Sequence, residues 1–163
     1  MIEGFFELQT PNDLLQKMRH DLEQMKVHPF DAYLAFNFFI TAESMLDWYF
    51  PGDENKVKRN ELRNSTWFLK ATSDLATGAK HFKPRGFHDT VSKAFVTPGS
   101  FPINSFPKGD FPKGSLGDGA LIICITEQTE GNDNDRFSAF DVATKVLEFW
   151  ENKLGLSDAN IHS

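Results

Sequence analysis

Residues 30–50, with the sequence FDAYLAFNFFITAESMLDWYF, are apolar almost all round when they are placed on a helix. A helix that is apolar on every side is buried by neighbouring elements on several sides. Proline at positions 29 and 51 bounds the segment, because it interrupts helical hydrogen bonding. We therefore expect a helix over residues 30–50 at the centre of the fold. Its large apolar residues are Tyr33, Leu34, Phe36, Phe38, Phe39, Ile40, Met45, Leu46, Trp48, Tyr49 and Phe50.

Three further helices are predicted around this central segment. The sequence Thr10-Pro11-Asn12-Asp13 is a typical helix start, with a threonine cap, proline at the first position and an acidic first turn, so a helix should span residues 11–27. An apolar stripe with helical spacing predicts a long third helix over residues 55–82. The sequence Ser138-Ala139-Phe140-Asp141 resembles a capping box and predicts a last helix over residues 138–154.

The remaining regular structure is expected to be a β-hairpin. Residues 87–96 predict one strand, and residues 121–126 predict another that is almost continuously apolar and therefore buried on both faces. The two predicted strands and the segment that joins them form a hairpin over about residues 87–126. A chain of 163 residues fits one domain. The expected fold is a single α+β domain over residues 1–163, mainly α: a four-helix bundle with a β-hairpin between its third and fourth helices.

Charge and hydropathy limit the classes of partner. A net charge of −6 and a pI near 5.3 argue against a whole-surface attraction to nucleic acid or anionic lipid. The basic stretch 56–63, next to Trp67, is the one candidate contact with nucleic acid, but a charge run at a helix start is usually a solvated face. No apolar run approaches the roughly 20 residues of a membrane span, and the first residues lack a signal-peptide layout. We expect a cytoplasmic protein that does not bind membranes.

A period of five marks the segment between residues 96 and 116. An apolar residue recurs at every fifth position, and the middle three, Phe101, Phe106 and Phe111, are each followed by proline. Proline bars this segment from a helix interior or a central strand, so the aromatic rings must find a surface groove, a partner chain or a ligand. Lys108 and Lys113 lie in its two Phe-Pro-Lys-Gly sequences and would keep the segment soluble when it is free.

Two interpretations of this Phe-Pro segment stay open. In the first, Phe101, Phe106 and Phe111 bind a partner protein or a second copy of the chain. In the second, they fold back over the helical bundle or the sheet edge of the same molecule. The first interpretation predicts a protein-interaction or assembly subunit, and this is the function that we expect, with a protein partner or a homo-oligomer.

Polar residues on the second and third helices form another candidate site. Glu43 and Asp47 are one turn apart, and Asp74 and His81 are two turns apart, so two facing helices would gather three carboxylates and an imidazole. Helical bundles bind metals with such groups, but they usually repeat a Glu-x-x-His element, which this sequence lacks. Ion pairs of Asp74 or Asp47 with Arg63 or Lys80, which would fix the helix register, are favoured, since buried charges need partners. We expect no metal and no other cofactor.

The stretch Ala76-Thr77-Gly78-Ala79-Lys80-His81-Phe82 resembles a helix end of a family of small, uncharacterised bacterial proteins. The segments 36–48 and 146–150 and the Phe-Pro-x-Gly sequences resemble other parts of that family. The resemblance extends from about Asp13 to Trp150. It implies a bacterial source but no activity, because none is established for the family.

A fainter resemblance, to HEPN-type helical bundles, supplies the alternative function. Several of those bundles are ribonucleases or nucleotide binders in toxin–antitoxin and phage-defence systems. The resemblance implies a polar centre at Arg63, Asp74, Lys80 and His81. Those nucleases carry a histidine four to six positions after an arginine on an inward helix face, and no pair in this sequence has that spacing.

Catalytic motifs are missing from the sequence. It contains no Gly-x-Ser-x-Gly elbow, no phosphate-binding glycine-rich loop before a helix and no zinc-type spacing of cysteine and histidine. The single cysteine, Cys124, cannot form an internal disulfide, and its apolar neighbours favour a buried thiol that only packs. We therefore expect a binding protein rather than an enzyme.

Overall fold

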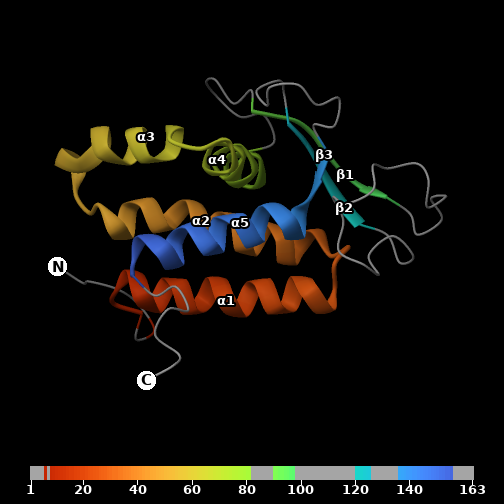
Figure 1. The fold of residues 1–163 in the computed structure, drawn as a ribbon, viewed down its shortest axis with the longest axis horizontal. Coiled ribbons are helices and arrows are strands. Elements are labelled where there is room, and N and C mark those ends of the chain that lie inside the picture. Colours follow the sequence, from red (N-terminus) through yellow and green to blue (C-terminus); the bar gives the residue numbers. More distant parts are fainter. Residues whose placement is uncertain (1–5, 7, 82–89, 98–119, 126–135, 156–163) are drawn as a thin grey trace.

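The computed structural model of the chain describes residues 6, 8–81, 90–97, 120–125 and 136–155. This part is mostly helical with a small antiparallel sheet (Figure 1), which confirms the predicted α+β, mainly α class. The elements in chain order are α1 (Pro11–Val27), α2 (Ala32–Tyr49), the short 3-10 helix η1 (Asp53–Asn55), α3 (Lys56–Asn64), α4 (Trp67–Lys80), β1 (Val91–Thr97), β2 (Ala120–Ile125), β3 (Arg136–Ser138) and α5 (Ala139–Lys153).

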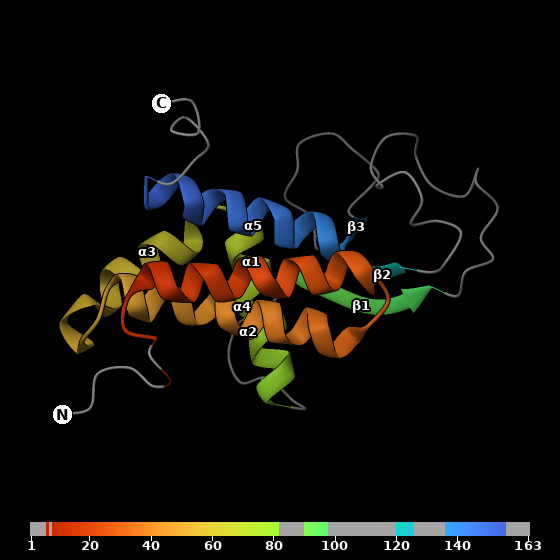
Figure 2. The same cartoon turned by 90° about the horizontal axis from the view of Figure 1, so that it is seen from below.

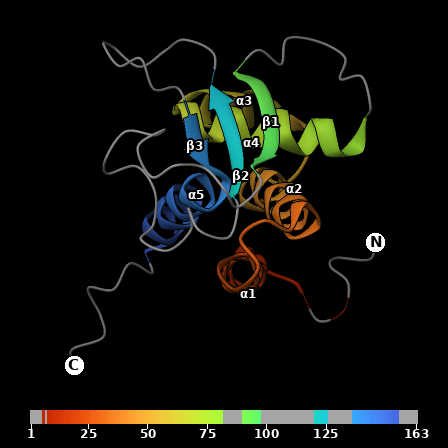
Figure 3. The same ribbon diagram turned by 90° about the vertical axis from the view of Figure 1, so that its right-hand side faces the viewer.

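Layers of helices and sheet enclose the core (Figures 1 and 3). The α1 helix forms one outer layer, α2 and α5 form the middle, and α4 with the sheet covers them on the opposite side. Because α2 contacts α1, α4 and α5, its predicted central position is confirmed. The largest fully buried apolar side chains are Trp150, Phe38, Phe39, Leu15, Met18, Met45, Leu46, Ile122, Ile123, Val142 and Val146.

Side-chain caps fix where three helices begin. The Thr10 hydroxyl accepts the backbone N–H of Asp13, whose carboxylate accepts the N–H of Thr10 at 2.8 Å, so α1 starts with the predicted cap. The Ser138 hydroxyl accepts the N–H of Asp141 at 3.0 Å at the start of α5. The Asp31 carboxylate caps the first turn of α2, which explains why that helix begins two residues later than predicted.

The prediction of one long helix over residues 55–82 is wrong in one respect. The chain forms two helices there, α3 and α4. Thr66 has an extended backbone, and its hydroxyl accepts the N–H of Leu69 at 3.2 Å, so it caps α4. The preceding Ser65 hydroxyl donates to the carbonyl of Leu62 at 2.7 Å at the end of α3. Serine and threonine offer the backbone an alternative to helical bonding, and here they interrupt it. The described part of the chain therefore has five α-helices, and α4 runs across α2 (Figure 1).

The sheet has the order β1-β2-β3, and both pairings are antiparallel. Its central strand β2 buries Leu121, Ile122 and Ile123, as its apolar sequence predicted. The last pair of the β1–β2 ladder is Thr97 with Ala120. The chain therefore leaves the sheet and rejoins it at the same point, on either side of residues 98–119.

The third strand was not predicted. Arg136 begins β3, which pairs with β2 through Cys124, Ile123 and Ile122. Three residues carry too little pattern to be recognised as a strand, and their conformation depends on hydrogen bonds to β2.

The central position of α2 gives a stability prediction. Phe39 is 1% exposed, so Phe39→Ala should lower the free energy of unfolding by about 3–5 kcal/mol through lost contacts and a residual cavity. Tyr33 lies on the same helix but is 82% exposed, so Tyr33→Ala should change the free energy of unfolding by less than about 0.5 kcal/mol. Urea denaturation of both variants compares the two values. Equal losses would show that α2 is not the centre of the core.

Candidate functional site

Three aromatic side chains are exposed around the first turns of α2. Phe30 is 47% exposed, Tyr33 is 82% exposed and Phe36 is 41% exposed. Tyr33 and Phe36 are three residues apart on α2 and therefore lie on one side of it, while Phe30 lies in the turn just before the helix. We call these three residues the aromatic surface. This corrects the expectation that the helix is buried all round, because in the described residues α1, α4 and α5 cover only its other sides. Figure 2 shows α2 lengthwise. Its first turns lie at the end of the molecule where β1 ends.

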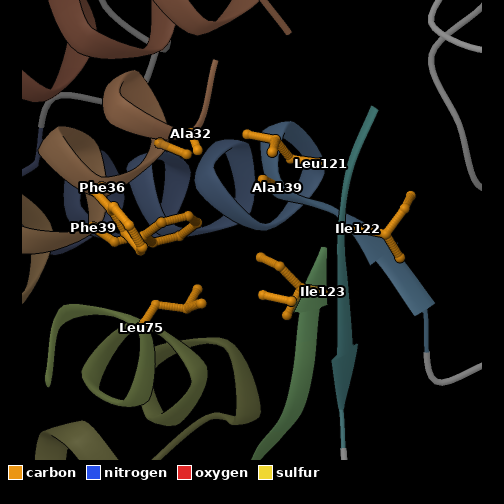
Figure 4. Close-up of a pocket in the computed structure, with 10 residues that line it drawn as sticks. Ala32, Phe36, Phe39, Leu75, Leu121, Ile122, Ile123 and Ala139 are labelled. Atoms are coloured by element: carbon orange, nitrogen blue, oxygen red, sulfur yellow. The ribbon is translucent and has the colours of Figure 1, made fainter. Parts of the chain in front are cut away.

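An apolar pocket of about 120 Å³ opens beside the aromatic surface (Figure 4). The rings of Phe36 and Phe39 lie on one side of it, and the side chains of Leu75, Leu121 and Ile123 lie around the rest. Five elements, α2, α4, β1, β2 and α5, contribute to its wall, so no single stretch of sequence could have predicted it. The lining residues are Ala32, Ala35, Phe36, Phe39, Leu75, Ala94, Leu121, Ile122, Ile123 and Ala139.

Burial of an apolar group is the only interaction that the described lining of this pocket offers. Every lining side chain is alanine, phenylalanine, leucine or isoleucine, and none of these can transfer a proton, ligate a metal or attack a substrate. A guest in the pocket would therefore be held by removal of its apolar surface from water, at roughly 25 cal/mol per Å². This chemistry fits the recognition of an aromatic or aliphatic side chain.

A partly buried ion pair between Arg63 and Glu43 joins α3 to α2, and Ser73 of α4 contacts the same carboxylate. Arg63 donates from Nε to Oε1 of Glu43 at 2.9 Å, and the hydroxyl of Ser73 lies 3.3 Å from the same oxygen. Burial raises the pKa of the Glu43 carboxyl, whereas the Arg63 guanidinium acts in the opposite direction. The sequence predicted ion pairs that fix helix register, but it assigned the arginine to Asp47 or Asp74 rather than to Glu43.

Of the four residues of the alternative polar centre, Arg63 and Lys80 both act on the carboxyl of Glu43 in the direction that lowers its pKa, against the effect of burial. Arg63 binds Glu43, and Oδ2 of Asp74 accepts the backbone N–H groups at the start of β1, at 2.8 and 2.9 Å. Lys80 and His81 are exposed at the end of α4. In the residues that the structure describes, no group of three or more histidine, cysteine or acidic side chains could hold a metal ion.

The residues of the Phe-Pro segment lie outside the described part of the chain. These are Phe101, Phe106 and Phe111 with Lys108 and Lys113, all within 98–119. The structure describes the residues on either side of this segment, Thr97 at the end of β1 and Ala120 at the start of β2. Among the described helices, none combines the length and the hydropathy that a membrane span requires.

Comparison with known proteins assigns no family to the chain. No protein-family model matches it, and neither a curated protein sequence nor a solved structure matches it. The resemblances to the small bacterial family and to HEPN bundles therefore stay predictions.

The Glu43–Arg63 pair predicts a specific pH dependence of stability. Because the pKa of Glu43 is raised in the folded state, its protonation stabilises the fold at low pH, and this contribution is lost as pH rises through the folded-state pKa. The difference in unfolding free energy between wild type and Glu43→Gln should therefore fall as pH rises from about 4 to 7. Urea denaturation over this range measures it.

Asp13 provides a control of opposite sign. Hydrogen bonds from Thr10 and from the backbone lower its pKa, so its contribution is present at neutral pH and is lost as pH falls. The difference between wild type and Asp13→Asn should therefore rise with pH, mainly at and below the ordinary aspartate pKa of about 4. Two differences that change in the same direction would contradict the account of Glu43.

Proposed function

We propose that this protein is a protein-interaction subunit that binds a partner chain, or a second copy of itself, through the Phe-Pro segment 98–119 and the aromatic surface. The observation that supports this most strongly is the exposure of Phe30, Tyr33 and Phe36 beside an open apolar pocket. Exposed apolar patches that are continuous with a groove are typical of surfaces that bind other proteins.

The position of the Phe-Pro segment supports the same role. It is attached to the sheet at Thr97 and Ala120, at the end of the molecule where α2 begins (Figures 1 and 2). The two strand ends that flank the segment therefore lie at the same end of the molecule as the aromatic surface. Interfaces concentrate their binding energy in a few aromatic anchors at a centre that is depleted of charge.

Two other classes of function have less support from the described residues. Within the basic stretch 56–63, Arg59 pairs with Asp47 and Arg63 pairs with Glu43, so half of its four cations are already engaged within the molecule. A phosphate backbone would have to compete with those carboxylates. Among the described residues that line the pocket, all are apolar, and none is a candidate for catalysis.

Replacing Phe101, Phe106 and Phe111 together by serine should abolish association, because each buried phenylalanine is worth about 1.5–3 kcal/mol of apolar burial. Light scattering measures self-association, and a pull-down from the native host with the purified chain as bait measures partner binding. A matched control replaces Lys108 and Lys113 by glutamine, which keeps all three rings, and this variant should still associate. If the triple variant keeps the oligomeric state and the partners of the wild type, the proposed function is wrong.

A further inference from the structure

We infer that the partner protein adds one of its extended segments to the outer edge of β1, with an apolar side chain in the pocket and an acidic residue beside the end of α4. The inference rests on the proposed function and deepens it, because it states the chemistry of the partner. The backbone of β1 holds the segment, and the pocket and the end of α4 select its side chains.

The strand β1 is an edge strand of the described sheet. The strand order is β1-β2-β3, so among the described strands β1 pairs with β2 alone. Its ladder with β2 is regular from Lys93 to Thr97, and the irregularity is confined to the step between Val91 and Lys93. An edge strand carries a row of backbone N–H and C=O groups to which another extended segment can pair.

The mouth of the pocket lies at this edge. Of the described residues that line the pocket, only Phe36 on α2 and Ala94 on β1 are exposed, so the pocket opens between them. Ala94 pairs with Ile123, which also lines the pocket (Figure 4). Directly paired residues share one face of a sheet. The residue of an added strand that lies opposite Ala94 therefore points to the same face, over the mouth of the pocket.

The size of the pocket restricts that residue to a single apolar side chain. Its volume is about 120 Å³, and all of its described lining is apolar. An apolar cavity of roughly 150 Å³ takes up one benzene molecule, so this pocket holds one side chain between leucine and phenylalanine in size. A charged or hydroxylated side chain would lose its hydrogen bonds to water without replacement.

Two exposed basic residues lie beside the start of β1. The N–H of Val91 donates to Asp74 on α4, so this helix packs against that end of the strand. The last turn of α4 projects past the outer edge of β1 (Figures 2 and 3), and it ends in Lys80 and His81. In the described part of the chain, neither of these two residues forms an ion pair. An acidic residue in the added segment would complement their charge.

The same charge favours a different chain over a second copy. The sequence of β1, VSKAFVT, contains no acidic residue. A second copy that paired through its own β1 would therefore bring no carboxylate of that strand to Lys80 and His81. A partner segment that combines an apolar residue with an acidic one satisfies both the pocket and the end of α4.

Selection of octapeptides from a random phage-displayed library on the full chain tests this recognition. Peptides that bind should share one residue of leucine to phenylalanine size, with an acidic residue to one side of it. In a synthetic copy of a selected peptide, serine at the apolar position should weaken binding about 10- to 100-fold, as expected when one large apolar side chain is no longer buried. A selection without binding peptides, or with peptides that lack the apolar position, would overturn the inference.

Variants of the protein separate the two contacts with the same synthetic peptide. Ala94→Phe places a ring at the mouth of the pocket and should weaken binding at least tenfold, whereas Val57→Phe adds a ring at an exposed site on α3 and should not. Lys80→Glu should weaken binding several-fold, and the matched change Lys145→Glu on the exposed side of α5 should not. Ala94→Leu replaces Ala94→Phe if that variant does not fold. Equal binding by Ala94→Phe or Ala94→Leu and wild type would overturn the inference.

Hydrogen exchange distinguishes pairing at the edge from binding in the pocket alone. When the peptide is bound, backbone N–H groups of β1 that point away from β2 become paired, so their exchange should slow at least tenfold. Exchange in α1, on the opposite side of the molecule, should stay the same. Unchanged exchange in β1 with bound peptide would show that the segment does not pair with the edge.

The inference and the proposed function fail through different results. Slowed exchange of β1 on self-association without peptide would place a second copy at the edge, which overturns the inference and leaves the proposed function in place. Conversely, edge pairing of the selected peptide combined with unchanged association of the triple serine variant would uphold the peptide site and refute the role of the Phe-Pro segment in the proposed function.

Discussion

Burial of one face of α2 is the interaction on which the rest of the structure depends. Phe38, Phe39, Met45 and Leu46 are each no more than 1% exposed, and they lie between α1, α4 and α5. At about 1.5–3 kcal/mol for each large side chain, this face contributes a major part of the burial that offsets chain entropy. The other helices and the sheet take their places by covering it, and the Glu43 ion pair then links α2 to α3 and α4.

The same helix explains why the domain has an apolar surface to offer. Its sequence is apolar almost all round, but the described elements cover only part of its circumference, and Tyr33 and Phe36 are left exposed. Beside them, five elements meet without filling the space between their side chains, which leaves the apolar pocket. Thr97 and Ala120, the strand ends on either side of residues 98–119, lie at this end of the molecule.

Local signals made the helix starts and the central helix predictable from the sequence. Thr10 and Ser138 act within three residues of their partners, so spacing alone identifies them. The break at Thr66 also had a local signal in the run Asn64-Ser65-Thr66, but the apolar stripe that continues across it outweighed that signal. The pairing of Glu43 with Arg63 joins residues 20 apart on different helices, and β3 and the pocket depend on contacts between distant elements. Periodicity carries no information about such contacts.

Hydroxyl-radical footprinting of the two tyrosines tests most directly whether the aromatic surface binds another chain. Tyr33 is 82% exposed in the single chain, and the half-buried Tyr49, at the other end of α2, provides an internal control. The account predicts that the oxidation rate of Tyr33 falls several-fold when the protein is in its native assembly, while the rate of Tyr49 stays the same. Equal oxidation of Tyr33 in the assembly and in the isolated chain would contradict it.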